Sequence, residues 1–337
     1  MFAPPEPFPS RTGQRGMMAS SAPGFRPEGE ASEANVSALA VDAPGNTSIM
    51  AVARDFLALT KPKIISLLLV TAAGGMFLAE QGVPSLALLG LVWAGGALAS
   101  GGANAVNHFL DRDIDRDMRR TQGRPVAGLR VAPRYALAFG IALNIAAFAL
   151  LATQVNLLAA VLTLCASLFY VFIYTLWLKR TTPNNIVIGG AAGAIPPMVG
   201  WAAVTGGLDL PAVYLFAIVF FWTPPHFWAL SLLIQSDYER AGVPMLPVVS
   251  SRRQTTLHIL LYSIALTGLT LMFGLLPQVG LIYVSAAAAL GAPFIWLAWR
   301  LWRRDDRGRA KATYLYSLAY LALLFVAIMV DSAVAFM

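Results

Sequence analysis

The stretch VPSLALLGLVWAGGALASGGANAVNHFLDRDIDRD, residues 83–117, decides the fold. Its first part, residues 83–106, has no charged side chain and exceeds the roughly 20 residues that a helix needs to cross a bilayer. Its last part places Asp on alternate residues from 111 to 117. Because lipid offers no partners to backbone polar groups, the apolar part is expected to be a continuous helix. The stretch therefore predicts a membrane helix with four carboxylates at its C-terminal end.

The composition of the chain is that of a membrane protein. Of its 337 residues, 58% are hydrophobic and 12% are charged, whereas soluble domains carry about 25% charged residues. The single cysteine, Cys165, lies in an apolar run, which excludes an intrachain disulfide and a zinc knuckle.

Charged residues divide the apolar sequence into runs that can be counted as spans. The runs from Arg134 to Lys179 and from Arg253 to Arg300 enclose 44 and 46 residues, enough for two spans each, and five other runs suit one span each. We therefore expect an all-α polytopic membrane protein: nine transmembrane helices in one bundle around a central cavity open to the cytoplasmic side. Residues 51–337 would form this domain. Residues 1–50, rich in Pro, Gly, Ser, Ala and Glu, are expected to be a disordered cytoplasmic tail.

The basic residues predict the orientation of these spans. All 24 Lys and Arg residues precede the first span or lie in the loops on its side of the membrane, and the opposite loops have none. The positive-inside rule then places the N-terminus in the cytoplasm. We favour a bacterial plasma membrane over the mitochondrial inner membrane, because four Glu residues among the first 33 count against a transit peptide. The net charge of +7 thus reflects topology and anionic headgroups rather than nucleic acid.

The residues Asn107, Asp111 and Asp115 predict a metal site. Their i, i+4, i+8 spacing puts them on one helical face. Stacked oxygen ligands suit Mg²⁺, which usually completes its shell with water and a substrate phosphate. Asp113 and Asp117 point elsewhere and are expected to be surface groups or supporting neighbours. The alternative is a solvated helix end on which the acids pair with nearby arginines.

A second acidic segment and several cations are expected on the same side. Asp237 follows the sixth span, and two acidic helix ends facing one cavity could hold two Mg²⁺ ions around a diphosphate. Arg120, Arg124 and Lys179 are the candidate diphosphate contacts, since Arg suits bidentate phosphate recognition. Ordinary positive-inside charge and snorkelling at the membrane surface are the alternatives.

Residues 222–228, Trp-Thr-Pro-Pro-His-Phe-Trp, lie within the sixth span. The proline pair predicts a kink, and a histidine inside a span such as His226 is a functional candidate by default. The flanking aromatic rings are suited to contact a flat porphyrin or to shield a carbocation. Packing between helices would explain the same rings equally well. His108, His258 and Asp331 receive no role at this point.

Together these motifs resemble the UbiA-type intramembrane prenyltransferases, whose hallmark is Asn-x-x-x-Asp-x-x-x-Asp. Residues 222–230 resemble the branch of this family that acts on haem b. The second family motif is usually Asp-x-x-x-Asp. Here the residues four before and four after Asp237 are Leu233 and Ala241, so the motif is incomplete. The second metal site therefore has fewer ligands than expected, and its ligand set is left open. The matching runs are residues 59–62, 115–125, 222–230 and 237–247.

The resemblance implies an activity. A Mg²⁺-dependent enzyme of this branch would transfer a farnesyl group from farnesyl diphosphate to the 2-vinyl group of haem b, making haem O for terminal oxidase assembly. Its product could pass to a downstream haem A synthase or an oxidase assembly factor. Two alternatives remain: a family member that acts on a quinone or chlorophyll-type acceptor, and a non-catalytic haem carrier. A carrier would need the histidine but not the clustered acids.

Overall fold

The computed structural model describes residues 48–334, and within them it contains helices and no strand. The predicted tail lies outside the described residues except for its last three positions. Ile49 and Met50, which the prediction placed in the tail, already belong to the helix α1 (Ile49–Thr60). The division of the chain at residue 50 otherwise stays a prediction.

The described residues contain nine helices long and apolar enough to cross a membrane, which confirms the predicted number. Two of these spans are composite: one joins α6 (Leu157–Leu168), the π-helix η1 (Phe169–Leu178) and α7 (Lys179–Thr181), and another joins α8 (Asn185–Ala194) and α9 (Pro196–Thr205). The other spans are α2 (Pro62–Glu80), α3 (Leu86–Leu110), α5 (Pro133–Gln154), α10 (Leu210–Leu233), α13 (Arg252–Phe273), α14 (Leu281–Arg303) and α15 (Arg307–Val334).

Proline pairs act differently in two of the spans. The fifth span is interrupted at Ile195, where Pro196 and Pro197 begin α9, because proline lacks the N–H that would continue the preceding helix. By contrast, α10 is helical throughout Pro224 and Pro225. The kink expected in α10 stays a prediction, while the break before α9 was not anticipated.

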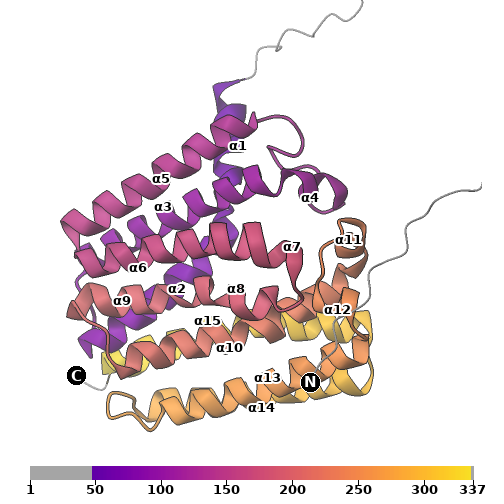
Figure 1. Cartoon of the computed structure of the whole chain (residues 1–337). Helices are drawn as coiled ribbons and strands as arrows, with labels where there is room; N and C mark the ends of the chain where they lie inside the picture. The colour runs from indigo at the N-terminus through magenta and orange to yellow at the C-terminus, as the bar shows by residue number, and fades with distance from the viewer. Residues whose placement is uncertain (1–47, 335–337) are drawn as a thin grey trace, which may run out of the picture. The chain divides into compact units, whose positions relative to one another are not determined.

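The long helices lie side by side, with α3 along α5, α2 along α9, and α13 beside both α10 and α14 (Figure 1). Small residues allow the closest approach. A Cβ added to Gly75 would collide with the backbone of Pro197, and one added to Gly200 would collide with the backbone of Ala72. Glycine at these two positions therefore permits α2 and α9 to pack backbone against backbone, as is common between membrane helices.

The short helices α4 (Arg112–Asp117), α7, α11 (Gln235–Arg240) and α12 (Leu246–Val249) gather at one end of the long helices, on the right in Figure 1. A cluster of apolar side chains packs α4 against α11. This cluster brings the two acidic segments to the same end of the bundle. Its buried members are Ile114, Met118, Ile186, Tyr238, Val243 and Met245, and Phe227 packs against them.

A candidate active site of buried oxygen ligands and basic side chains

Asn107, Asp111 and Asp115 share one face of the helical segment that crosses from α3 into α4. The helical hydrogen bonds continue across the junction: the N–H of Asp111 donates to the Asn107 carbonyl at 2.9 Å, and the N–H of Asp115 donates to the Asp111 carbonyl at 2.8 Å. All three side chains are buried, whereas Asp113 and Asp117 are exposed. The shared face expected from the spacing is therefore present.

Each of these three residues accepts a hydrogen bond from one basic side chain. Lys61 Nζ donates to Asn107 Oδ1 at 2.8 Å, and Lys179 Nζ donates to Asp111 Oδ2.

The third contact joins Arg124 to Asp115. Nη1 of Arg124 lies 2.8 and 2.9 Å from the two carboxylate oxygens of Asp115. Lys61 and Lys179 reach their partners from 46 and 68 residues away, whereas Arg124 lies nine residues from Asp115. Asp111 and Asp115 are buried, which is not the environment of a solvated helix end.

One oxygen of this site has no hydrogen-bond partner. Asp111 Oδ2 accepts from Asn107 Nδ2 at 2.7 Å as well as from Lys179, but the buried Oδ1 atom accepts no hydrogen bond from the described residues. Nη2 of Arg180 lies 3.6 Å from this oxygen, beyond hydrogen-bond distance. An orphaned buried carboxylate oxygen is costly unless something cationic or a water satisfies it.

Burial and neighbouring charged groups shift the pKa of two side chains at this site. Burial, and then the neighbouring Arg124, lower the pKa of Lys61 to about 7. Hydrogen bonds from Arg180 at 2.7 and 2.8 Å hold the pKa of Asp113 well below its usual range. Lys61 also has a left-handed backbone with φ 54°, an uncommon conformation for a residue other than glycine.

The second acidic segment adjoins this site through the backbone. Asp237 is buried, and its carboxylate accepts a long hydrogen bond of 3.4 Å from the main-chain N–H of Arg120 and one of 3.1 Å from Arg240. The Arg120 residue itself is exposed. A cavity of about 160 Å³ lies between the two acidic segments, lined by Asp113, Ile114, Asp117, Arg180, Ala241, Gly242 and Val243.

The donor set fits a hard divalent cation. Within residues 48–334, no three His, Cys, Asp or Glu side chains gather closely enough to hold a metal ion by themselves. The amide oxygen of Asn107, the carboxylates of Asp111 and Asp115 and a substrate phosphate would be the oxygen ligands that Mg²⁺ prefers. The metal site stays a prediction.

Two residues that we did not predict as ligands belong to this site. Lys61 lies at the bend between α1 and α2, and Arg180 follows Lys179. The sequence does contain a feature that could have identified Lys61. This lysine belongs to the family-like stretch 59–62 and immediately precedes the proline that begins a span. Periodicity does not reveal this lysine, because its partner Asn107 is 46 residues away.

His226 lies among aromatic rings near the same end of the bundle. Its imidazole stacks on Trp222 with 4.4 Å between ring centroids and contacts Tyr314 and Phe227 at 5.0 and 5.1 Å. Phe227 also packs against the apolar cluster that holds α4 to α11. Phe227 therefore links His226 to the apolar cluster that holds α4, with its acidic residues, against α11.

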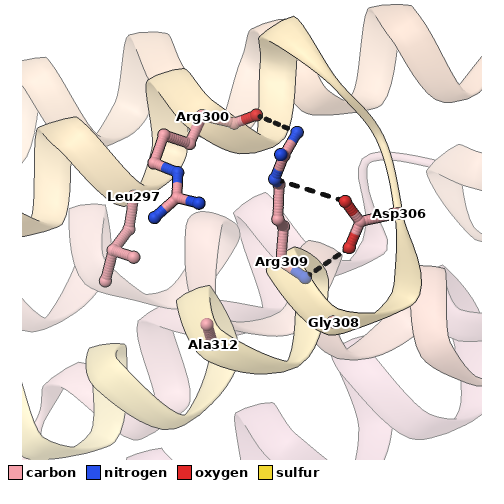
Figure 2. Close-up of a pocket in the computed structure, with 6 residues that line it drawn as sticks. All are labelled: Leu297, Arg300, Asp306, Gly308, Arg309 and Ala312. Atoms are coloured by element: carbon pink, nitrogen blue, oxygen red, sulfur yellow. Dashed lines mark hydrogen bonds and ion pairs between the residues drawn. The ribbon is translucent and has the colours of Figure 1, made fainter.

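A separate cavity of about 310 Å³ lies between α14 and α15 and shares no lining residue with this site (Figure 2). Its lining residues are Leu297, Arg300, Asp306, Gly308, Arg309 and Ala312. Arg309 pairs with Asp306 at 3.2 Å in this cavity. The central cavity predicted from the sequence stays a prediction.

Within the described residues, nine membrane-spanning helices are combined with buried Asn and Asp oxygens that lie beside basic side chains, and this arrangement fits the UbiA class of intramembrane prenyltransferases. Residues 68–328 match the UbiA prenyltransferase family, and the chain belongs to this family. The chain is thus an integral multi-pass membrane protein, as the resemblance in its motifs predicted.

The curated relatives carry a more specific name. The chain is 53% identical over 281 residues to "Protoheme IX farnesyltransferase" of Thermus thermophilus, covering 83% of this chain and 46% of that relative. It is 53% identical over 282 residues to "Protoheme IX farnesyltransferase 1" of Saccharopolyspora erythraea, covering 83% and 90%. It is 47% identical over 294 residues to the protein named "Protoheme IX farnesyltransferase" in Acidiphilium cryptum, covering 84% and 92%. The chain spans about half the length of the Thermus relative that it matches.

Solved structures share the fold at low sequence identity. A digeranylgeranylglyceryl phosphate synthase matches with a TM-score of 0.69 at 18% identity, covering 83% of this chain and 98% of that chain. A UbiA homologue from Archaeoglobus fulgidus "bound to GPP and Mg2+" matches with a TM-score of 0.62 at 17% identity, covering 81% and 99%. These likenesses establish the fold of this chain.

Proposed function

We propose that this chain transfers a farnesyl group from farnesyl diphosphate to the 2-vinyl group of haem b, forming haem O. The name shared by relatives about 50% identical over most of this chain supports the reaction. The observation in the structure that carries the proposal is the set of buried oxygens on Asn107, Asp111 and Asp115, each beside one basic side chain. This arrangement suits a substrate that brings both a metal and a diphosphate.

The diphosphate end of the substrate would lie at these residues. Asn107, Asp111 and Asp115, joined by Asp237, would hold Mg²⁺, which neutralises negative charge on the leaving diphosphate when it is bound. The UbiA homologue with GPP and Mg²⁺ supports this choice of metal.

The basic side chains would bind the phosphate oxygens directly. Lys61, Lys179 and Arg124 already point basic nitrogen atoms at the ligand oxygens, so each is placed to contact a diphosphate bound there. Arg120 and Arg180 add positive charge at the mouth of the site. Arginine contributes a planar, bidentate donor pair that matches phosphate geometry.

The reaction breaks the allylic C–O bond and forms one C–C bond and one new C–O bond. The allylic C–O bond of farnesyl diphosphate breaks and its electron pair leaves with the diphosphate. The electron-rich vinyl group attacks the allylic cation, and water then adds to the new cation and loses a proton, which leaves the hydroxyl of haem O. The helix bundle must exclude water until the C–C bond has formed.

The haem end is proposed to lie at His226. The stacked Trp222 and the neighbouring Tyr314 supply flat apolar surface for a porphyrin, and the imidazole supplies a ligand or an orienting contact. A His226→Ala variant with unchanged haem affinity and turnover would remove this part of the proposal.

The setting of the enzyme is also proposed. We infer a bacterial plasma membrane with the N-terminus in the cytoplasm, from the one-sided distribution of all 24 basic residues. The domain 51–337 would then be the prenyltransferase domain, preceded by a cytoplasmic tail of 50 residues. Haem O would be passed to a haem A synthase or an oxidase assembly factor.

A membrane assay tests the function. Membranes containing the chain are incubated with haem b, farnesyl diphosphate and Mg²⁺, and the haem is analysed by chromatography and mass spectrometry. A hydroxyethylfarnesyl haem that is absent with the Asp111→Ala variant supports the proposal. Unmodified haem from folded wild-type protein would reject it, and farnesylation of a quinone precursor instead would identify the alternative acceptor.

A further inference from the structure

The hydroxyl of Ser317 in α15 links two helices beside His226. Ser317 is fully buried, and its Oγ lies 2.7 Å from the carbonyl oxygen of Tyr314 and 2.8 Å from Nδ1 of His226. Both distances are those of good hydrogen bonds. The direction of each bond determines where the proton of the imidazole lies.

The hydroxyl has one proton, and a carbonyl oxygen can only accept. Ser317 therefore donates to the Tyr314 carbonyl and must accept from His226, so Nδ1 carries the imidazole proton. The aromatic surroundings of His226 favour the neutral imidazole, which has a single N–H. The lone pair is then on Nε2, which takes part in no hydrogen bond among the described residues.

The same residue also orients the ring that stacks on the histidine. The indole N–H of Trp222 donates to the main-chain carbonyl of Ser317 at 2.7 Å, and Trp222 lies against the imidazole face. The main-chain contact would survive replacement of the Ser317 side chain. Substitution by alanine therefore isolates the effect of the hydroxyl.

We propose that Ser317 is a positioning residue that fixes His226 as the Nδ1–H tautomer, so that Nε2 is presented as a ligand to the iron of the haem substrate. Metal-bound histidines almost always donate their other ring N–H to a partner that sets the tautomer and orientation. This inference rests on the proposed function, because it takes haem b as the acceptor substrate.

The tautomer can be measured without haem. The chain has three histidines, so ¹⁵N-histidine NMR of the full chain, with His226→Gln to assign the signal, gives few resonances. We expect protonated Nδ1 and unprotonated Nε2 at His226 in the wild type, and loss of that preference in Ser317→Ala. A wild-type His226 protonated on Nε2 would overturn the proposal whatever the enzyme transfers.

Haem affinity is the second measurement. Purified protein is titrated with ferric haem b while the Soret band and the electron paramagnetic resonance signal are followed. Loss of a partner that orients a metal ligand typically weakens metal binding about 10- to 100-fold, so Ser317→Ala should raise the Kd by about that factor. Ser317→Thr keeps a hydroxyl and should restore both the tautomer and the spectrum.

Ser332→Ala is a matched control, since Ser332 is also buried in α15 and its hydroxyl has no partner among the described residues. It should leave the haem Kd unchanged. A Ser317→Ala variant with wild-type haem affinity would overturn the role of Ser317 even if farnesyl transfer is confirmed. Conversely, haem bound through His226 without any farnesylated product would reject the proposed function and leave the role of Ser317 standing.

Discussion

Replacing Asp111 by asparagine should separate the charge of the proposed metal site from its shape. The substitution keeps the size of a fully buried side chain and removes its negative charge beside Lys179. Asp113→Asn is the matched control, because it makes the same change two residues away at a side chain that is 60% exposed. The two variants differ mainly in whether the lost charge faces the site.

The expected magnitudes differ widely. Two unit charges about 4 Å apart interact by about 4 kcal/mol at an effective dielectric constant of 20, which corresponds to about a thousandfold in rate if the charge acts on the bound cation. The exposed pair of Asp113 with Arg180 contributes about 0–1 kcal/mol, as surface ion pairs do. We therefore expect Asp111→Asn to lose about three orders of magnitude in turnover and Asp113→Asn to lose about fivefold at most.

Turnover is measured with farnesyl diphosphate and haem b over a series of Mg²⁺ concentrations, on protein shown to be folded by gel filtration. Asp111→Asn should also require more Mg²⁺ for half-maximal turnover. The reasoning is refuted if Asp111→Asn keeps more than a tenth of the wild-type rate, or if the two variants lose activity equally.

Three further outcomes are expected. Lys61→Gln should lower kcat/KM for farnesyl diphosphate about 10-fold or more, since a hydrogen bond to a charged group contributes about 1.5–3 kcal/mol. The control Lys63→Gln changes an exposed lysine and should have little effect. Equal effects of the two substitutions would contradict the role of Lys61. Asp331→Ala should lower the free energy of unfolding by about 3 kcal/mol, because three main-chain N–H groups of residues 280, 282 and 283 lose their acceptor. Thermal melts would show this loss, and an unchanged Tm would contradict it. Removal of divalent cations with a chelator should abolish turnover, and added Mg²⁺ should restore it; full turnover in chelator would exclude the metal.

The number of spans and the shared face of the acids could be predicted because both are local properties. A run of about 20 apolar residues crosses a membrane wherever it occurs, and residues four apart share a helical face. The same reasoning fails at Ile195, where a span breaks before Pro196, while α10 continues through its own proline pair. Local preference alone does not distinguish these two proline pairs.

The sequence by itself determined that the chain is an integral membrane protein, the nine membrane spans found in the described residues, the shared helical face of Asn107, Asp111 and Asp115, and the family. Only the tertiary structure decided which cation faces which oxygen and where the proton of His226 lies. Lys61 meets Asn107 across 46 residues, and His226 meets Ser317 across 91. The physical reason is that such hydrogen bonds depend on which helices pack together, and packing is a property of the whole bundle rather than of any segment.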